Sequence, residues 1–194
     1  MVKSQFNEKI KNRLHLEQNK HLSIFALAPI PLLIYFGHLL SDIPTADVYQ
    51  LHREPQSWEW QPHPEEFEFT IRKSKNYSSV VALNISLSAT INNERITDVL
   101  GEDISIWTIT IDHPYNDFLK SKEQLQMFRE TFRKALNEIK AVHDSAKELH
   151  VFPALPVSIG IEIGRIRMPK ADLPFVIYDE NKKNGGFKKT IDLV

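Results

Sequence analysis

The sequence contains no cysteine and neither of the glycine-rich motifs that cradle a nucleotide cofactor. The lack of cysteine excludes disulfides, thiolate nucleophiles and zinc–thiolate sites, and it fits a reducing cytosol, so we predict a cytoplasmic protein. A dinucleotide fold would need G-x-G-x-x-G after its first strand, and a phosphate loop would need G-x-x-x-x-G-K-[ST]. Histidines are scattered without metal-ligand spacing. We therefore expect no cofactor and no metal.

An excess of positive charge is also missing. The 24 basic residues are balanced by 25 acidic ones, which gives a net charge of −1. A general nucleic-acid-binding surface would need a clear basic excess, so we expect no direct DNA binding by this domain. The composition, 42% hydrophobic and 25% charged, is that of an ordinary soluble domain.

One nearly uncharged stretch, residues 22–40, is long enough to raise the question of a membrane span. Pro29 and Pro31 interrupt it, and each would cost about 3 kcal/mol inside a helix. A second copy of the same pattern, described below, carries Glu162, Arg165 and Arg167, as expected of an element in water. We therefore predict a buried strand and helix and no membrane segment.

The chain is organised around residues 21–53. The apolar run 22–27 predicts a strand, the two prolines a tight turn, residues 32–40 a helix and residues 47–51 a second strand. A strand that runs into a helix and returns as a strand is a βαβ unit, in which the two strands are parallel.

The same pattern recurs at residues 149–179, which indicates two βαβ units related by internal pseudo-symmetry. In this alignment the following positions correspond: Phe25 and Phe152, Pro29 and Pro156, Ile30 and Val157, Ile34 and Ile161, Gly37 and Gly164, Tyr49 and Tyr178. We expect Gly164 to lie where its helix meets the sheet.

The remaining sequence alternates strands and helices within one α/β body. Residues 1–19, with Phe6, Ile10 and Leu14 at four-residue spacing, predict a leader helix or a linker end. Strands are expected at 67–72, 80–88 and 104–111, a short helix or turn at 91–100, and a hairpin strand at 187–193. Residues 121–143 predict a helix that begins with a Ser121–Gln124 capping box. We place the first half at about 20–115 and the second at about 116–194.

Ligands of open α/β sheets lie beyond the carboxyl ends of the strands, at helix starts. Both units place a proline-bounded turn there, at 28–32 and 153–158. Each helix start offers free N–H groups and partial positive charge, which suits a phosphate, and the Ser158 hydroxyl can donate to an anion. The alternative is that these turns only pack the two halves together.

Two strings resemble the SAVED domain, the sensor module of bacterial anti-phage signalling. They are HVFPALPVSIGIEIGRIRMPKADLPFVIYD, with F-P-A-x-P-V-S, G-R and M-P-K in order, and SIFALAPIPLLIYFGHLLSD followed by VYQLHR and WEW. The resemblance covers about residues 20–193. It implies two fused CARF-like, Rossmann-like halves and a receptor for a cyclic oligonucleotide, in systems of the CBASS type or in type III CRISPR defence. Ligand binding would then drive oligomerisation and switch on a nuclease, TIR or protease effector.

The chain has no room for such an effector, so we expect either an excised sensor domain or a stand-alone sensor, without catalysis of its own. The resemblance implies a ligand pocket, and we assign it these residues: Ala28, Pro29, Ile30, Pro31, Leu32, Phe152, Pro153, Ala154, Leu155, Pro156, Val157 and Ser158 from the two turns; Ser86 and Ser88 from a central strand; Arg53 and Lys120 as phosphate partners; and Trp58, Trp60 and Tyr178 as stacking surfaces. Arg165 and Arg167 are expected on the surface or in an oligomer contact. Core packing is the alternative for the two tryptophans.

Two other functions stay open. One is a nuclease that degrades cyclic oligonucleotides in the same pocket. The other is a structural module that oligomerises without any ligand.

Overall fold

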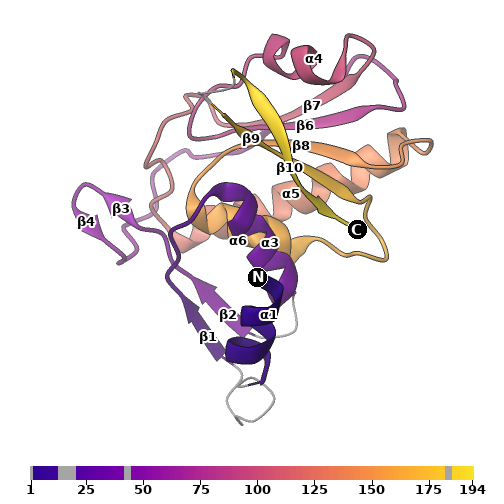
Figure 1. Ribbon diagram of the computed structural model, residues 1–194. Helices are drawn as coiled ribbons and strands as arrows, with labels where there is room; N and C mark the ends of the chain where they lie inside the picture. Colours follow the sequence, from indigo (N-terminus) through magenta and orange to yellow (C-terminus); the bar gives the residue numbers. More distant parts are fainter. Residues whose placement is uncertain (1, 13–20, 42–44, 182–184) are drawn as a thin grey trace.

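The computed structural model of the protein describes residues 2–12, 21–41, 45–181 and 185–194 (Figure 1). Its helices are α1 (Val2–Phe6), the π-helical turn η1 (Asn7–Lys11), α3 (Ile30–Leu40), α4 (Glu94–Leu100), α5 (Lys122–Val142) and α6 (Val157–Ile166). Its strands are β1 (His21–Ile24), β2 (Thr45–Val48), β3 (His52–Arg53), β4 (Gln56–Ser57), β5 (Thr70–Arg72), β6 (Val81–Ser86), β7 (Ser105–Thr110), β8 (Leu149–Ala154), β9 (Phe175–Glu180) and β10 (Phe187–Leu193).

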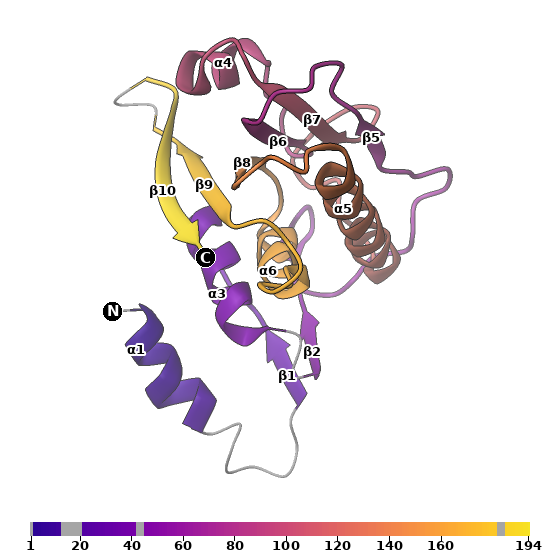
Figure 2. The same ribbon diagram turned by 90° about the vertical axis from the view of Figure 1, so that its right-hand side faces the viewer.

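The main sheet has six strands in the order β10-β9-β8-β6-β7-β5. Its four inner strands are parallel, and β5 and β10 close the two edges in antiparallel pairing. Side chains alternate between the faces of a strand. Accordingly Leu83 and Ile85 of β6 join the core with the buried face of α5, whereas Ala82 packs with Ile96 of α4. The two helices therefore cover opposite faces of the sheet (Figure 2).

Helix α5 forms as its sequence predicts. The Ser121 hydroxyl accepts from the Gln124 N–H, and the Gln124 side chain accepts from the Ser121 N–H, which completes the capping box. Its apolar stripe is buried on the sheet from Leu125 to Ile139, and Val142, in the last turn, is exposed.

The predicted repeat is confirmed in three dimensions. The first unit, β1–α3–β2, and the second unit, β8–α6–β9, each have two parallel strands joined by a helix. Phe25 stacks on Tyr49 at 4.4 Å and 11°, and Phe152 stacks on Tyr178 at 4.4 Å and 10°. A third ring meets each pair edge-on, Trp58 at 5.3 Å from Phe25 in the first unit and Phe187 at 5.1 Å from Phe152 in the second.

The two units differ in what covers these rings. In the second unit Phe152, Tyr178 and Phe187 are buried together with two isoleucines. Ile91 precedes α4, and Ile96 belongs to it. In the first unit no described helix takes that place, and Phe25 is 53% exposed. The first unit therefore leaves Phe25 exposed and the other two rings half-buried, whereas the second unit buries all three of its rings.

Helices α3 and α6 cross at the two aligned glycines. A Cβ on Gly164 would lie 2.0 Å from the Ile34 carbonyl oxygen, and a Cβ on Gly37 would lie 2.0 Å from the Ile161 carbonyl oxygen. The expected helix–sheet contact of Gly164 is thus wrong, because its neighbour is the backbone of α3. Only glycine at both positions allows the two helices to approach this closely.

The strands are not shared equally between the units. β5, β6 and β7 precede residue 115, yet they pair within the sheet of the second unit, whereas the first unit keeps only the β1–β2 sheet among the described residues. The first half of about 20–115 is therefore spatially divided. At the N-terminus, Phe6 is buried and meets Phe36 of α3 at 6.1 Å, while Leu14 lies outside the described residues.

The charges on α6 are buried instead of solvated, which corrects the expectation for Arg165 and Arg167. Glu162 is 2% exposed and pairs with Arg129 of α5 and with Arg165. Arg165 also donates to the Ala46 carbonyl of the first unit at 3.2 Å. Burial raises the pKa of Glu162, and the two arginines oppose that shift. Arg165 therefore forms a buried contact between the two units.

Candidate functional site

The topology places a crevice at the carboxyl end of β6. From β6 the chain continues into its neighbour β7 and later returns on the other side as β8, so the strand order reverses there. Such a switch point is where open α/β sheets bind ligands. The Leu87 and Ser88 N–H groups, just after β6, donate to the Ala154 carbonyl at the end of β8 at 2.9 and 2.8 Å.

A cavity of about 420 Å³ lies at this crevice, between the two units. We call it the inter-unit pocket. The first unit and the segment after it supply Leu27, Gln50, Leu51, His52, Arg53 and Gln56, and the rest of the wall is Ser88, Asn116, Asp117, Leu155, Pro156 and Val157.

Five of the predicted site residues line this pocket: Arg53, Ser88, Leu155, Pro156 and Val157. The structure thus brings one predicted turn, 153–158, to the pocket together with a strand end and a cation. The other turn, 28–32, adjoins it through Leu27, with Ala28, Pro29 and Leu32 exposed and Pro31 buried.

Ser158 is fully buried, and its hydroxyl donates to Gln50 Oε1 at 2.8 Å. The Ser158 N–H points at the same oxygen, at 3.4 Å. The Gln50 carboxamide therefore occupies the donors of the first turn of α6 that the sequence suggested for an anion. Pro153 is buried as well, and the Ala154 carbonyl is held by the two N–H groups after β6.

Lys120 is engaged inside the protein. Its Nζ lies 2.6 Å from Asp117 Oδ2, and the Arg53 N–H donates to Asp117 Oδ1 at 3.2 Å. Burial alone would raise the pKa of Asp117, but these hydrogen bonds hold it below its ordinary value. The Arg53 guanidinium, by contrast, is exposed, and no ion pair for it occurs among the described residues.

The aromatic candidates separate into two groups. Phe152 and Tyr178 are buried under α4, and Trp60 is half-buried against the core and meets the His52 ring edge-on at 5.9 Å. Trp58 remains beside the exposed Phe25. Among these rings only Phe25 is exposed to solvent, and Trp58 beside it is half-buried.

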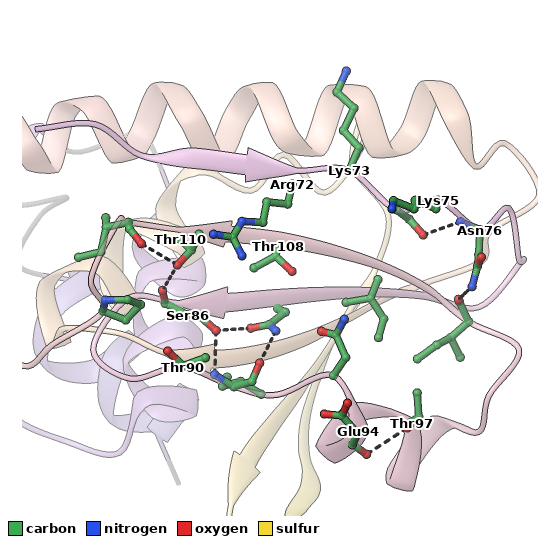
Figure 3. Close-up of a pocket in the computed structure, with 18 of the residues that line it drawn as sticks. Arg72, Lys73, Lys75, Asn76, Ser86, Thr90, Glu94, Thr97, Thr108 and Thr110 are labelled. Atoms are coloured by element: carbon green, nitrogen blue, oxygen red, sulfur yellow. Dashed lines mark hydrogen bonds between the residues drawn. The ribbon is translucent and has the colours of Figure 1, made fainter.

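A second cavity, of about 720 Å³, lies on the open face of β5–β7 beside α4, and we call it the sheet-face groove (Figure 3). Ser86 belongs here. Its hydroxyl donates to Asn84 and accepts from the Ile91 N–H, and Asn84 donates to the Ile91 carbonyl. Arg72 projects over this floor from β5 (Figure 3). The floor groups largely satisfy one another, which makes this groove the weaker candidate.

Sequence reasoning missed several residues of the inter-unit pocket. Gln50, Leu51 and His52 follow the second strand of the first unit, and the carboxyl-end rule could have indicated them. Asn116 and Asp117 lie in a loop before α5 and reach the pocket only through the fold, so the sequence gives no signal for them.

The part of the chain that the structure describes contains no helix with the length and hydropathy to cross a bilayer. Within the same residues, no three histidine, cysteine or acidic side chains gather where they could hold a metal ion.

Solved structures support the fold at low sequence identity, and no curated protein matches the chain. The Acinetobacter baumannii Cap4 SAVED/CARF-domain containing receptor with 2′3′3′-cAAA has a TM-score of 0.69 and 15% identity, over 94% of this chain and 40% of that one. The same receptor with 3′3′3′-cAAA has a TM-score of 0.66 and 15% identity, over 93% of this chain and 40% of that one. The Moraxella osloensis Cap4 SAVED/CARF-domain containing receptor has a TM-score of 0.55 and 15% identity, over 95% of this chain and 40% of that one.

This chain thus spans about 40% of the length of those receptors. The model of the SMODS-associated and fused to various effectors sensor domain matches residues 2–193, nearly the whole sequence. The chain therefore belongs to the SAVED family of sensor domains.

Proposed function

We propose that the inter-unit pocket binds a cyclic oligonucleotide second messenger, and that the chain is a sensor in anti-phage signalling of the CBASS type. The observation that carries this proposal is the position of the pocket. It lies at the switch point of the sheet, and both βαβ units contribute to its wall. The related receptors, whose structures contain cyclic trinucleotides, support the ligand class.

The chemistry of the wall suits such a ligand. Arg53 supplies an exposed guanidinium for a phosphodiester, and charge-assisted hydrogen bonds of this kind are the stronger ones. Ser88 adds a hydroxyl from the end of β6, and Leu155 to Val157 form an apolar side. The exposed Phe25 ring, with the half-buried Trp58 against its edge, offers a base a stacking surface beside the pocket, at roughly 1–3 kcal/mol per stacked base.

Thermal unfolding against a panel of cyclic di-, tri- and tetranucleotides tests the ligand class. At about a hundred times its dissociation constant, a bound ligand adds roughly 2.7 kcal/mol of stability. For a domain of this size that raises Tm by roughly 5–10 °C. A folded protein whose Tm no panel member changes would contradict the proposal.

A matched pair of arginine variants locates the site. We expect Arg53→Ala to weaken binding of the active panel member by about tenfold or more, because one charge-assisted hydrogen bond is worth roughly 1.5–3 kcal/mol. Arg72→Ala, in the sheet-face groove, removes the same charge from an equally exposed position and should leave the affinity unchanged. The reverse pattern in a calorimetric titration would move the site to the sheet-face groove.

The proposal extends to signalling. Ligand binding would promote self-association and activate a fused or associated effector, a nuclease, a TIR domain or a protease, in the cytoplasm. Light scattering with and without ligand separates this sensor from a structural module, which would assemble without ligand. Chromatography of the ligand after incubation separates it from a nuclease, which would release a linear product.

A further inference from the structure

His52 stands out among the buried polar residues. It follows the second strand of the first unit, lines the inter-unit pocket and is fully buried. Neither ring nitrogen has a hydrogen-bond partner among the described residues. Buried polar side chains in native proteins are nearly always hydrogen-bonded, so an unpartnered imidazole at a cavity wall calls for an explanation.

The charged groups that act on His52, Asp117 and Lys120, come from the segment just before α5. Asp117 Oδ1, in the loop before α5, lies 3.8 Å from His52 Nδ1. The same carboxylate accepts hydrogen bonds from Lys120 Nζ and from the Arg53 N–H, so its negative charge is already paired with Lys120. The rings of His52 and Trp60 meet edge-on, with their centroids 5.9 Å apart. Burial lowers the pKa of His52, Asp117 opposes that shift and Lys120 adds to it. In the free protein near neutral pH the imidazole is therefore neutral.

We propose that His52 is a ligand-binding residue of the inter-unit pocket, which takes up a proton and donates a hydrogen bond to a phosphodiester when a cyclic oligonucleotide binds. The inference rests on the proposed function of this pocket. The proton comes from solvent and forms one N–H bond on the imidazole, and no bond of the ligand breaks.

The charges of the pocket favour this arrangement. A phosphodiester stays anionic at neutral pH, and each linkage of the ring carries one negative charge. Arg53 is the exposed cation of the wall, whereas Lys120 and Asp117 neutralise each other. A permanent second charge would be costly to bury in the free protein, but a histidine becomes charged only when an anion arrives. His52 thereby couples the affinity for the anionic phosphate to the uptake of a proton.

Calorimetry measures the coupled proton directly. The probe is 3′3′3′-cAAA or 2′3′3′-cAAA, whichever raises Tm, titrated into the full chain at neutral pH in buffers of different ionisation enthalpy. We expect a net uptake of up to one proton per ligand. Above the ordinary histidine pKa of 6.5 the affinity should fall as the pH rises, by up to about tenfold per pH unit, because burial holds the pKa of free His52 below that value and the bound phosphate raises it. His52→Gln should remove the uptake and flatten this dependence.

Two further variants complete the test. His113→Gln removes an exposed histidine outside the inter-unit pocket and should keep the full proton uptake. Asp117→Asn should reduce the uptake even if His52→Gln fails to fold, because the carboxylate favours the protonated imidazole. Binding heat without proton uptake in the parent protein would overturn the role of His52 alone. If neither probe binds, another panel member that raises Tm takes its place, and no binding of any panel member would overturn this role and the proposed function together.

Discussion

We expect Gly164→Ala to lower the free energy of unfolding by about 3 kcal/mol, the upper end of the range for overpacked sites. The added methyl group would lie 2.0 Å from the Ile34 carbonyl oxygen and 2.4 Å from the His38 nitrogen. Both are backbone atoms of α3, so no rotamer change relieves the contact and the helices must separate. For a chain of this length the Tm should fall by roughly 6–12 °C.

The same helix contains the control. A Cβ on Gly160 would meet only side-chain atoms, at 3.4 Å or more. Gly160→Ala should therefore leave the stability unchanged or raise it by up to about 1 kcal/mol, since alanine favours a helix. If Gly164→Ala proved as stable as Gly160→Ala, the close crossing of α3 and α6 would be contradicted.

A double-mutant cycle tests whether the two glycines act as one contact. Gly37→Ala alone should cost about as much as Gly164→Ala, because its Cβ would lie equally close to the Ile161 carbonyl. Once one methyl group has separated the helices, the second meets more space. We therefore expect the double variant to cost at least about 1 kcal/mol less than the sum, and strict additivity would argue against a shared contact.

Ser158→Glu should destabilise the fold by about 3–5 kcal/mol, the range for an uncompensated buried charge. Ser158 is fully buried, and the atom facing it is the carbonyl oxygen of the Gln50 side chain, which repels a carboxylate. From the sequence alone this substitution would be expected to abolish ligand binding and leave the fold intact. The buried contact between the two units changes the expectation to a loss of stability.

Two variants separate the charge from its size. Ser158→Ala should cost only about 1 kcal/mol, for one lost hydrogen bond. Ser158→Gln has the volume of glutamate without its charge. Burial raises the folded-state pKa of the introduced carboxyl, so Ser158→Glu should approach Ser158→Gln in stability as the pH falls toward about 5 and diverge from it at about pH 8. Equal unfolding midpoints for the two at pH 8 would mean that the side chain reaches solvent.

Much of the structure of this protein follows from local sequence patterns, and the sequence predicts that part of the structure. Strand propensity, helix periodicity and prolines set the order of elements, and Ser121 and Gln124 set the start of α5. The repeat was visible because Phe25 and Tyr49, like Phe152 and Tyr178, form ring pairs that both units need. The family strings also lie in these segments.

The site was predicted only in part, because a pocket between two units depends on long-range contacts. The carboxyl-end rule identified Ser88 and 155–157, which follow strands directly. It could not show that Gln50 would occupy the donors at the start of α6, or that Asp117 would reach His52 from a distant loop. Gln50 and Ser158 are 108 positions apart in the sequence, and His52 and Asp117 are 65 apart (117 − 52).

The sequence by itself determined the α/β class, the two βαβ units and the membership in a sensor family, because these follow from local patterns and short strings. The tertiary structure decided which predicted residues face the inter-unit pocket and which are buried. Ser158, Tyr178 and Arg165 each look suited to a ligand or a surface, yet contacts from the other unit or from α4 bury them. Burial depends on what lies opposite in space, and only the folded chain brings those partners together.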